Sequence, residues 1–170
     1  MIRLGNFPGY DLLSSNDTEG NTILPLDISF EKQFKEIINK DQYSDKVFTD
    51  EQYYMLETLL DKNHFSFSGP TSFGKSFILT SFIKNLMMNN RRGLNIVFLV
   101  PTRALVSQTL KKLKHVVDDV EGYFLSSSPD IPALLHNRNP HYIFVFTPER
   151  LLHYFSVASN PTIEYVFVDE

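Results

Sequence analysis

A loop at positions 69–76 constrains the fold of this 170-residue chain more than any other feature. Its pattern is G-x-x-x-x-G-K-[ST], and Gly69, Gly74, Lys75 and Ser76 occupy the fixed positions. Glycines at these places let successive backbone N–H groups point inward, which suits a ligand with several phosphate oxygens. The residues expected to bind that ligand are Gly69, Pro70, Thr71, Ser72, Phe73, Gly74, Lys75 and Ser76.

The last two residues of this loop give it a specific chemistry. The Lys75 ammonium suits the β- and γ-phosphates of a triphosphate, and the Ser76 hydroxyl offers an oxygen to Mg²⁺. A helix expected from Gly74 to about residue 89 adds unpaired N–H groups and the positive end of its dipole. A strand is expected before the loop, at 64–68. The sequence therefore predicts binding of ATP with Mg²⁺ between a strand and a helix.

Apolar periodicity predicts alternating helices and strands through most of the chain. Residues 1–27 are expected to be largely irregular, and Gly93 is expected to end the helix after the loop in the left-handed conformation. Further helices are expected at 28–39, 49–60, 103–117, 132–137 and 148–155, and strands at 95–100, 122–126, 142–146 and 163–168. This alternation indicates an α/β domain with a mostly parallel sheet and helices on both faces.

Two carboxylates follow the last expected strand. Asp169 and Glu170 come directly after 163–168, at the edge of an open α/β sheet where ligands bind. Asp169 is predicted to hold Mg²⁺ together with Ser76, and Glu170 to orient and deprotonate an attacking water. The predicted catalytic residues are thus Lys75 and Glu170.

Composition narrows the class of protein. Cysteine is absent, which excludes disulfide scaffolds and thiolate metal sites. A net charge of −4 argues against coating nucleic acid by bulk charge, but it allows a grip on a few phosphates. No apolar run is long enough to cross a bilayer, so we expect a cytoplasmic protein with no membrane partner.

The order and spacing of these motifs resemble the first RecA-like domain of superfamily 2 helicases, the DEAD/DEAH-box-like group. Gln52 looks like the glutamine that reads the adenine edge in that family, although it also completes a helix capping box with Thr49. The segment 101–108 is similar to motif Ia, 147–150 to motif Ib, and 168–170 to the opening of motif II.

In that family the turns of motifs Ia and Ib touch the sugar–phosphate backbone of a single strand. The resemblance implies that single-stranded DNA or RNA contacts Thr102, Arg103, Thr147, Pro148 and Arg150. Hydroxyls, guanidinium groups and helix N-terminal amides bind phosphate oxygens without reading bases, so such binding is independent of base sequence and weakened by salt. Taken alone, the two turns are also explained as a strand exit and a helix start.

The resemblance covers about residues 46–170, and residues 1–45 form a lead-in of loop and helix. In the family, a further strand and a second RecA-like domain with arginine fingers follow, so the chain is expected to be part of a longer protein. The expected function is the ATP-binding domain of a nucleic-acid-dependent ATPase, a helicase or translocase. Without arginine fingers we expect weak hydrolysis.

Other functions remain open. One is a nucleotide-gated binding module without turnover, and another is the motor subunit of a restriction or defence complex. A small-molecule kinase leaves the turns at Pro101 and Thr147 unexplained. A GTPase is disfavoured, because the nearest match to its guanine-reading pattern, 39–42, precedes the loop and ends on Gln42.

Overall fold

The computed structural model describes residues 5–14, 24–61, 63–70, 73–90, 93–136 and 138–168. The chain divides into two compact units, Met1–Asn85 and Leu86–Glu170. No helix among the described residues is both long and apolar enough to cross a membrane.

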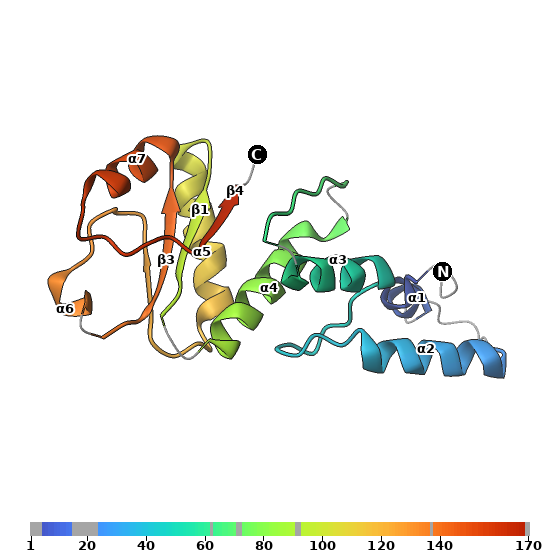
Figure 1. The fold of residues 1–170 in the computed structure, drawn as a ribbon. Coiled ribbons are helices and arrows are strands. Elements are labelled where there is room, and N and C mark those ends of the chain that lie inside the picture. Colours follow the sequence, from blue (N-terminus) through green and yellow to red (C-terminus); the bar gives the residue numbers. More distant parts are fainter. Residues whose placement is uncertain are drawn as a thin grey trace. The chain divides into compact units, whose positions relative to one another are not determined.

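The first unit is helical in its described residues (Figure 1). Buried hydrophobic side chains among its residues include Phe7, Phe48, Leu56, Leu59, Ile78, Phe82 and Ile83. The rings of Phe48 and Phe77 stack with their centroids 4.5 Å apart. Its elements are α1 (Phe7–Ser14), α2 (Leu26–Ile38), α3 (Asp50–Asp61) and α4 (Lys75–Asn89), of which α4 continues into the second unit.

Helix α1 lies in a region that the sequence analysis expected to be irregular, and for these residues that expectation was wrong. The Asn6 side chain accepts a hydrogen bond from the Gly9 backbone N–H at 3.1 Å, which caps the first turn. Pro8 is tolerated there because first-turn N–H groups have no helical partner. Phe7 is fully buried. Capping and burial therefore outweigh the turn-forming composition.

The strand expected at 64–68 is absent from the described residues, and that prediction was wrong. Residues 65–70 belong to no strand, and no ladder joins them to a described strand. Strand structure requires such a partner, since the ladder satisfies the backbone N–H and C=O groups. The apolar run at 64–68 carries no information about whether a neighbouring strand is present.

The second unit is built on a parallel four-stranded sheet, which confirms the predicted α/β class. The strand order is β2-β3-β1-β4 and every pairing is parallel. The central register places Val97 between Phe144 and Val166. The elements are β1 (Asn95–Leu99), α5 (Arg103–Val117), β2 (Tyr123–Ser126), α6 (Ala133–His136), β3 (His141–Phe146), α7 (Pro148–Ser156) and β4 (Tyr165–Val168).

Helices α5 and α7 cover opposite faces of this sheet (Figure 1). The crossover from β1 to β2 passes β3 in one direction, and the crossover from β3 to β4 passes β1 in the other. Because parallel crossovers are right-handed, their helices lie on opposite faces. The face under α7 carries a mainly aromatic hydrophobic core cluster of Val97, Tyr142, Phe144, Phe146 and Tyr154.

A partly buried polar cluster joins the start of β1 to the segment that enters β4. The Asn95 side-chain amide donates to Tyr154 Oη at 2.7 Å and to the Pro161 carbonyl at 2.9 Å. Tyr154 Oη in turn donates to the same carbonyl at 2.7 Å. The Asn95 backbone N–H donates to the Glu164 carboxylate at 2.8 Å. These bonds fix β4 beside β1, at the strand end opposite to the predicted site.

Gly93 does not end a helix in the left-handed conformation, because its φ is not positive. It is required for a different reason. A Cβ atom on Gly93 would lie 2.2 Å from the Pro140 carbonyl oxygen and 2.5 Å from that of Asn139. This glycine therefore allows the chains entering β1 and β3 to approach each other closely.

His141 makes the stability of the second unit dependent on pH. Its Nδ1 accepts a hydrogen bond from the Leu94 backbone N–H at 3.1 Å, so the bound imidazole is neutral. Burial lowers the pKa of His141, and the charge of Glu164 opposes that shift only in part.

The unfolded chain therefore binds a proton more readily than the folded one at mildly acidic pH. We expect the free energy of unfolding to be constant above a pH of about 6.5 and to fall as the pH drops from there through the lower folded pKa. His141→Asn, which keeps an acceptor for Leu94, should flatten this slope in urea denaturation at pH 5 to 7.5. Equal slopes in both proteins would contradict the assignment.

Candidate functional site

The phosphate-type loop runs directly into the first turn of α4, as predicted. The Phe73 N–H bonds to the Pro70 carbonyl at 3.0 Å, and the N–H groups of Phe77 and Ile78 bond to the Gly74 carbonyl at 2.9 and 3.1 Å. Helix α4 begins at Lys75, so its unpaired first N–H groups lie at the end of the loop. The predicted ligands Thr71 and Ser72 lie outside the described residues.

Gly74 must be a glycine for two reasons. Its φ is +79°, in the left-handed region that residues with a side chain rarely adopt. A Cβ atom there would also lie 2.7 Å from Nε2 of Gln52. The absence of a side chain at the second glycine of the motif therefore allows the Gln52 side chain of α3 to approach the loop backbone.

The Lys75 side chain folds back over the loop. Its Nζ donates to the Gly69 carbonyl at 2.8 Å, and the Phe73 ring packs against Gly69. The Ser76 side chain, one residue along α4, is exposed. A ligand with phosphate oxygens offers Lys75 a charged acceptor in place of a neutral carbonyl, and such hydrogen bonds are about twice as strong. The residues present therefore fit ATP and a magnesium ion held by the Ser76 hydroxyl.

Gln52 connects α3 to this loop. It forms a reciprocal capping box with Thr49, since Thr49 N–H donates to Gln52 Oε1 at 3.0 Å and Gln52 N–H donates to Thr49 Oγ1 at 3.2 Å. The capping prediction is confirmed. The remaining group, Nε2, donates to the Phe73 carbonyl at 2.8 Å. The side chain thus holds the loop as well as the helix, while its contact with adenine stays a prediction.

Two variants separate these roles of Gln52. Gln52→Glu keeps an acceptor for Thr49 N–H but cannot donate to the Phe73 carbonyl, whereas Gln52→Ala loses both bonds. We expect Gln52→Ala to lower the free energy of unfolding by about 0.5–2 kcal/mol and Gln52→Glu to retain most of it. Both should weaken ATP binding, measured by titration beside a Glu57→Gln control on the exposed side of α3. Wild-type ATP affinity in Gln52→Glu would show that the bond to Phe73 does not shape the loop.

The second unit places two predicted contact turns at one edge of its sheet. Strands β1 and β3 are parallel neighbours, with Leu99 paired to Phe146, so the turns that follow them are adjacent. Thr102 caps α5 by accepting from the Leu105 N–H at 3.4 Å. Pro148 is the first residue of α7, as predicted. Thr102, Arg103 and Pro148 are exposed there.

Glu149 also lies at these turns, and the sequence analysis did not predict it as a site residue. Its pKa is lowered, first by a hydrogen bond from the Thr147 side chain, then by its own backbone N–H and by the charge of Arg103. The only sequence signal for it is the preference for acidic residues in the first turn of a helix.

Two of the predicted nucleic-acid contacts are engaged within the fold. Thr147 is buried and bonded to Glu149, and Arg150 donates from Nη1 to the Ser127 carbonyl at 2.9 Å. Arg150 therefore positions the loop after β2. The arrangement leaves Thr102 and Arg103 as the accessible polar side chains among the five predicted contacts.

The predicted carboxylate site stays a prediction. Strand β4 ends at Val168 as expected, and Asp169 and Glu170 lie outside the described residues.

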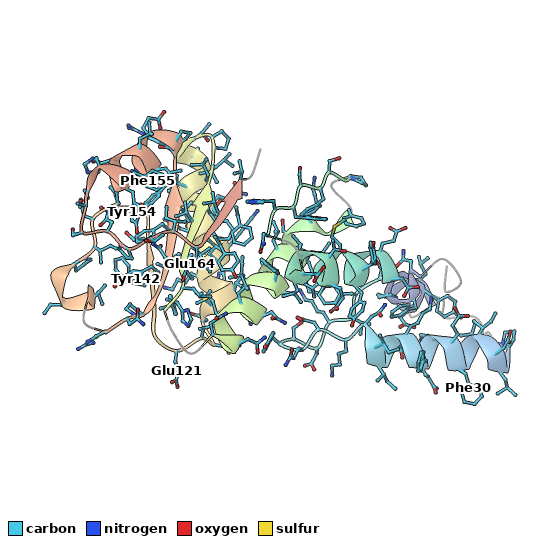
Figure 2. All side chains as sticks on the ribbon, in the orientation of Figure 1. Phe30, Glu121, Tyr142, Tyr154, Phe155 and Glu164 are labelled. Carbon is cyan, nitrogen blue, oxygen red and sulfur yellow. The ribbon has the colours of Figure 1, made fainter. Side chains whose placement is uncertain are left out.

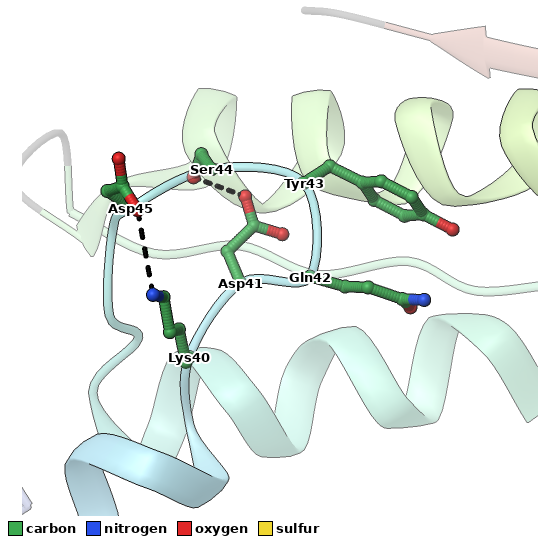
Figure 3. A pocket seen from close by; sticks show the side chains of 6 residues that line it. All are labelled: Lys40, Asp41, Gln42, Tyr43, Ser44 and Asp45. Atoms are coloured by element: carbon green, nitrogen blue, oxygen red, sulfur yellow. Dashed lines mark hydrogen bonds and ion pairs between the residues drawn. The ribbon is translucent and has the colours of Figure 1, made fainter.

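A polar hollow lies elsewhere in the first unit, in the loop between α2 and α3 (Figure 3). Its side chains bond to one another, as Ser44 does to Asp41 and Lys40 to Asp45 at 3.5 Å. It contains none of the predicted site residues. The residues that line it are Lys40, Asp41, Gln42, Tyr43, Ser44 and Asp45.

Comparison with known proteins agrees with the motif order. The family model described as DEAD/DEAH box helicase matches residues 49–170, a segment that contains every predicted site residue. No curated protein matches the chain.

Proposed function

Because this chain belongs to the DEAD/DEAH box helicase family, we propose that it binds ATP and Mg²⁺ as part of a nucleic-acid-dependent ATPase, a helicase or translocase. The observation that carries the proposal is the loop itself. Gly74 adopts the left-handed backbone conformation, and α4 starts at the next residue. The Lys75 ammonium donates a hydrogen bond to the Gly69 carbonyl and so lies over the loop. These are the groups that a triphosphate requires.

Each residue of the proposed nucleotide site has a separate role. Lys75 leaves the Gly69 carbonyl for the β- and γ-phosphates, and the loop N–H groups bind the remaining oxygens. Ser76 and Asp169 hold Mg²⁺, which neutralises charge on the phosphates when it is bound. Glu170 orients a water and accepts its proton. Gln52 holds the loop and reads the adenine edge.

In our proposal, residues 46–170 form the RecA-like domain and residues 1–45 its lead-in. A second RecA-like domain supplies arginine fingers, on which fast hydrolysis depends. We place the protein in the cytoplasm.

Single-stranded DNA or RNA is the proposed partner of the turns after β1 and β3. Arg103 and the N-terminus of α5 bind backbone phosphates, and Thr102 adds a hydroxyl. These contacts are electrostatic and independent of base sequence, so we expect salt to weaken them.

The test is whether nucleic acid and ATP binding are coupled. We would titrate a fluorescent ATP analogue with and without single-stranded oligonucleotides of DNA and of RNA. Because coupling between two ligands is reciprocal, an oligonucleotide that binds the motor should change ATP affinity. Arg103→Ala should remove the effect of the oligonucleotide and leave ATP binding intact. Arg138→Ala, which changes another exposed arginine of the second unit, should leave the effect of the oligonucleotide unchanged. ATP binding that no oligonucleotide alters would favour the nucleotide-gated module instead.

A further inference from the structure

Helix α2 presents an apolar stripe to the outside of the first unit. None of its residues is buried. Leu26, Phe30, Phe34 and Ile37 follow the spacing of one helix face and are 76%, 68%, 65% and 77% exposed. Figure 2 shows Phe30 pointing away from the other helices of its unit. Monomeric proteins seldom expose large side chains in such a continuous row.

The opposite face of α2 is the one that binds its own unit, and it is charged. Lys32 pairs with Asp11 on α1, and Lys35 pairs with Asp50 at the start of α3. Asn39 Nδ2 also donates to Asp50, at 2.9 Å. The side chains of Lys32 and Lys35 are only 20% and 23% exposed, far less than the two phenylalanines. The helix is therefore docked by its polar face, and its apolar face remains available.

We propose that this stripe binds the same stripe of a second copy of the chain, with the two helices antiparallel. A twofold interface brings one surface against itself, so the stripe must be self-complementary. An antiparallel pair centred near position 32 sets Leu26 opposite Ile38 of the second copy and Phe30 opposite its Phe34. The two helix dipoles then point in opposite directions, which is the favourable arrangement for neighbouring helices.

Charge at the ends of the stripe favours this direction over the parallel one. Asp27 lies in the first turn of α2, and Lys40 follows its last turn. In the antiparallel pair, Asp27 of one copy lies within about one helical turn of Lys40 of the other. A parallel pair would set Asp27 against Asp27 and Lys40 against Lys40. The exposed ion pair that Lys40 makes with Asp45, at 3.5 Å, is of a kind that contributes little stability.

The apolar area of the stripe indicates how tightly the two copies should bind each other. With Ile38, which is 44% exposed, the five side chains present on the order of 600 Å², since a large side chain buries about 150–250 Å². Two copies would bury roughly 1,200 Å², at the lower end of specific interfaces. We therefore expect a reversible dimer that forms as the protein concentration rises and dissociates on dilution.

The first experiment measures the mass of the chain by light scattering across a concentration series. The wild type should shift from monomer to dimer. Phe30→Gln with Phe34→Gln should be monomeric at concentrations where the wild type is half dimeric. Leu152→Gln with Phe155→Gln, which changes two exposed apolar residues of α7 in the second unit, should dimerise as the wild type does. A monomeric wild type, or equal loss of dimer in both variants, overturns the proposal.

The second experiment tests the antiparallel arrangement directly and uses the absence of cysteine from the chain. Leu26→Cys combined with Ile38→Cys should give a disulfide-linked dimer under mild oxidation. Leu26→Cys alone should not, because twelve residues at 1.5 Å each separate the two Leu26 positions by about 18 Å along the pair. Crosslinking by Leu26→Cys alone would overturn the antiparallel pair.

Discussion

Replacing Lys75 with alanine is expected to weaken ATP binding by roughly 10- to 100-fold, the value of one or two hydrogen bonds to a charged group. In the structure the ammonium is anchored on the Gly69 carbonyl, so alanine removes the only described cation at the loop. The fold should tolerate the change, because the backbone bonds that start α4 do not involve this side chain.

A fluorescent ATP analogue measures the effect, and Lys112→Ala supplies the matched control. Lys112 is an exposed lysine of α5, remote in sequence from the loop. Thermal unfolding of both variants shows whether the fold is kept. If Lys75→Ala binds ATP as tightly as the Lys112 control does, the loop is not the phosphate site.

Tyr154→Ala is expected to produce the largest loss of stability, about 3–5 kcal/mol, as for other buried aromatic residues. Its ring is buried in the cluster under α7, with centroids 5.3 Å from Phe144 and 5.7 Å from Phe146. Its hydroxyl also accepts from Asn95 and donates to Pro161. Alanine would leave a cavity and remove both hydrogen bonds.

Two neighbouring changes divide this effect into its parts. Tyr154→Phe removes only the hydroxyl and should cost about 0.5–1.5 kcal/mol, since Asn95 still bonds to Pro161. Phe155→Ala changes an exposed ring and should stay within about 0.5 kcal/mol of the wild type. Urea denaturation gives all three values. A loss in Phe155→Ala equal to that in Tyr154→Ala would place the core elsewhere.

Local pattern was sufficient to predict most of the second unit. The apolar run at the centre of β1 and the alternating aromatic residues of β3 predicted buried strands, and Thr102 and Pro148 marked the starts of α5 and α7. The start of α4 followed from the motif, whose second glycine, Gly74, has a positive φ immediately before the helix. Each of these features depends on residues close together in sequence.

The errors arose where distant residues decide the structure. Burial of Phe7 makes α1 a helix, and Pro140 explains Gly93, yet neither contact is visible in a local pattern. Periodicity predicted α2 correctly but could not show that its charged face, through Lys32 and Lys35, would be the docked one. The hydrogen bond that Glu149 accepts from Thr147 joins residues two positions apart, whereas the effect of the Arg103 charge on the pKa of Glu149 depends on two strands lying side by side.

The most direct test of the central claim is calorimetric titration of ATP into the wild-type chain, with Mg²⁺ and with the metal chelated. We expect one ATP bound per chain, with an affinity that falls when Mg²⁺ is removed, because in the proposed site Ser76 and the loop would bind the metal and the phosphates together. Absence of binding in both conditions, from a chain whose helices and cooperative unfolding are intact, would contradict it.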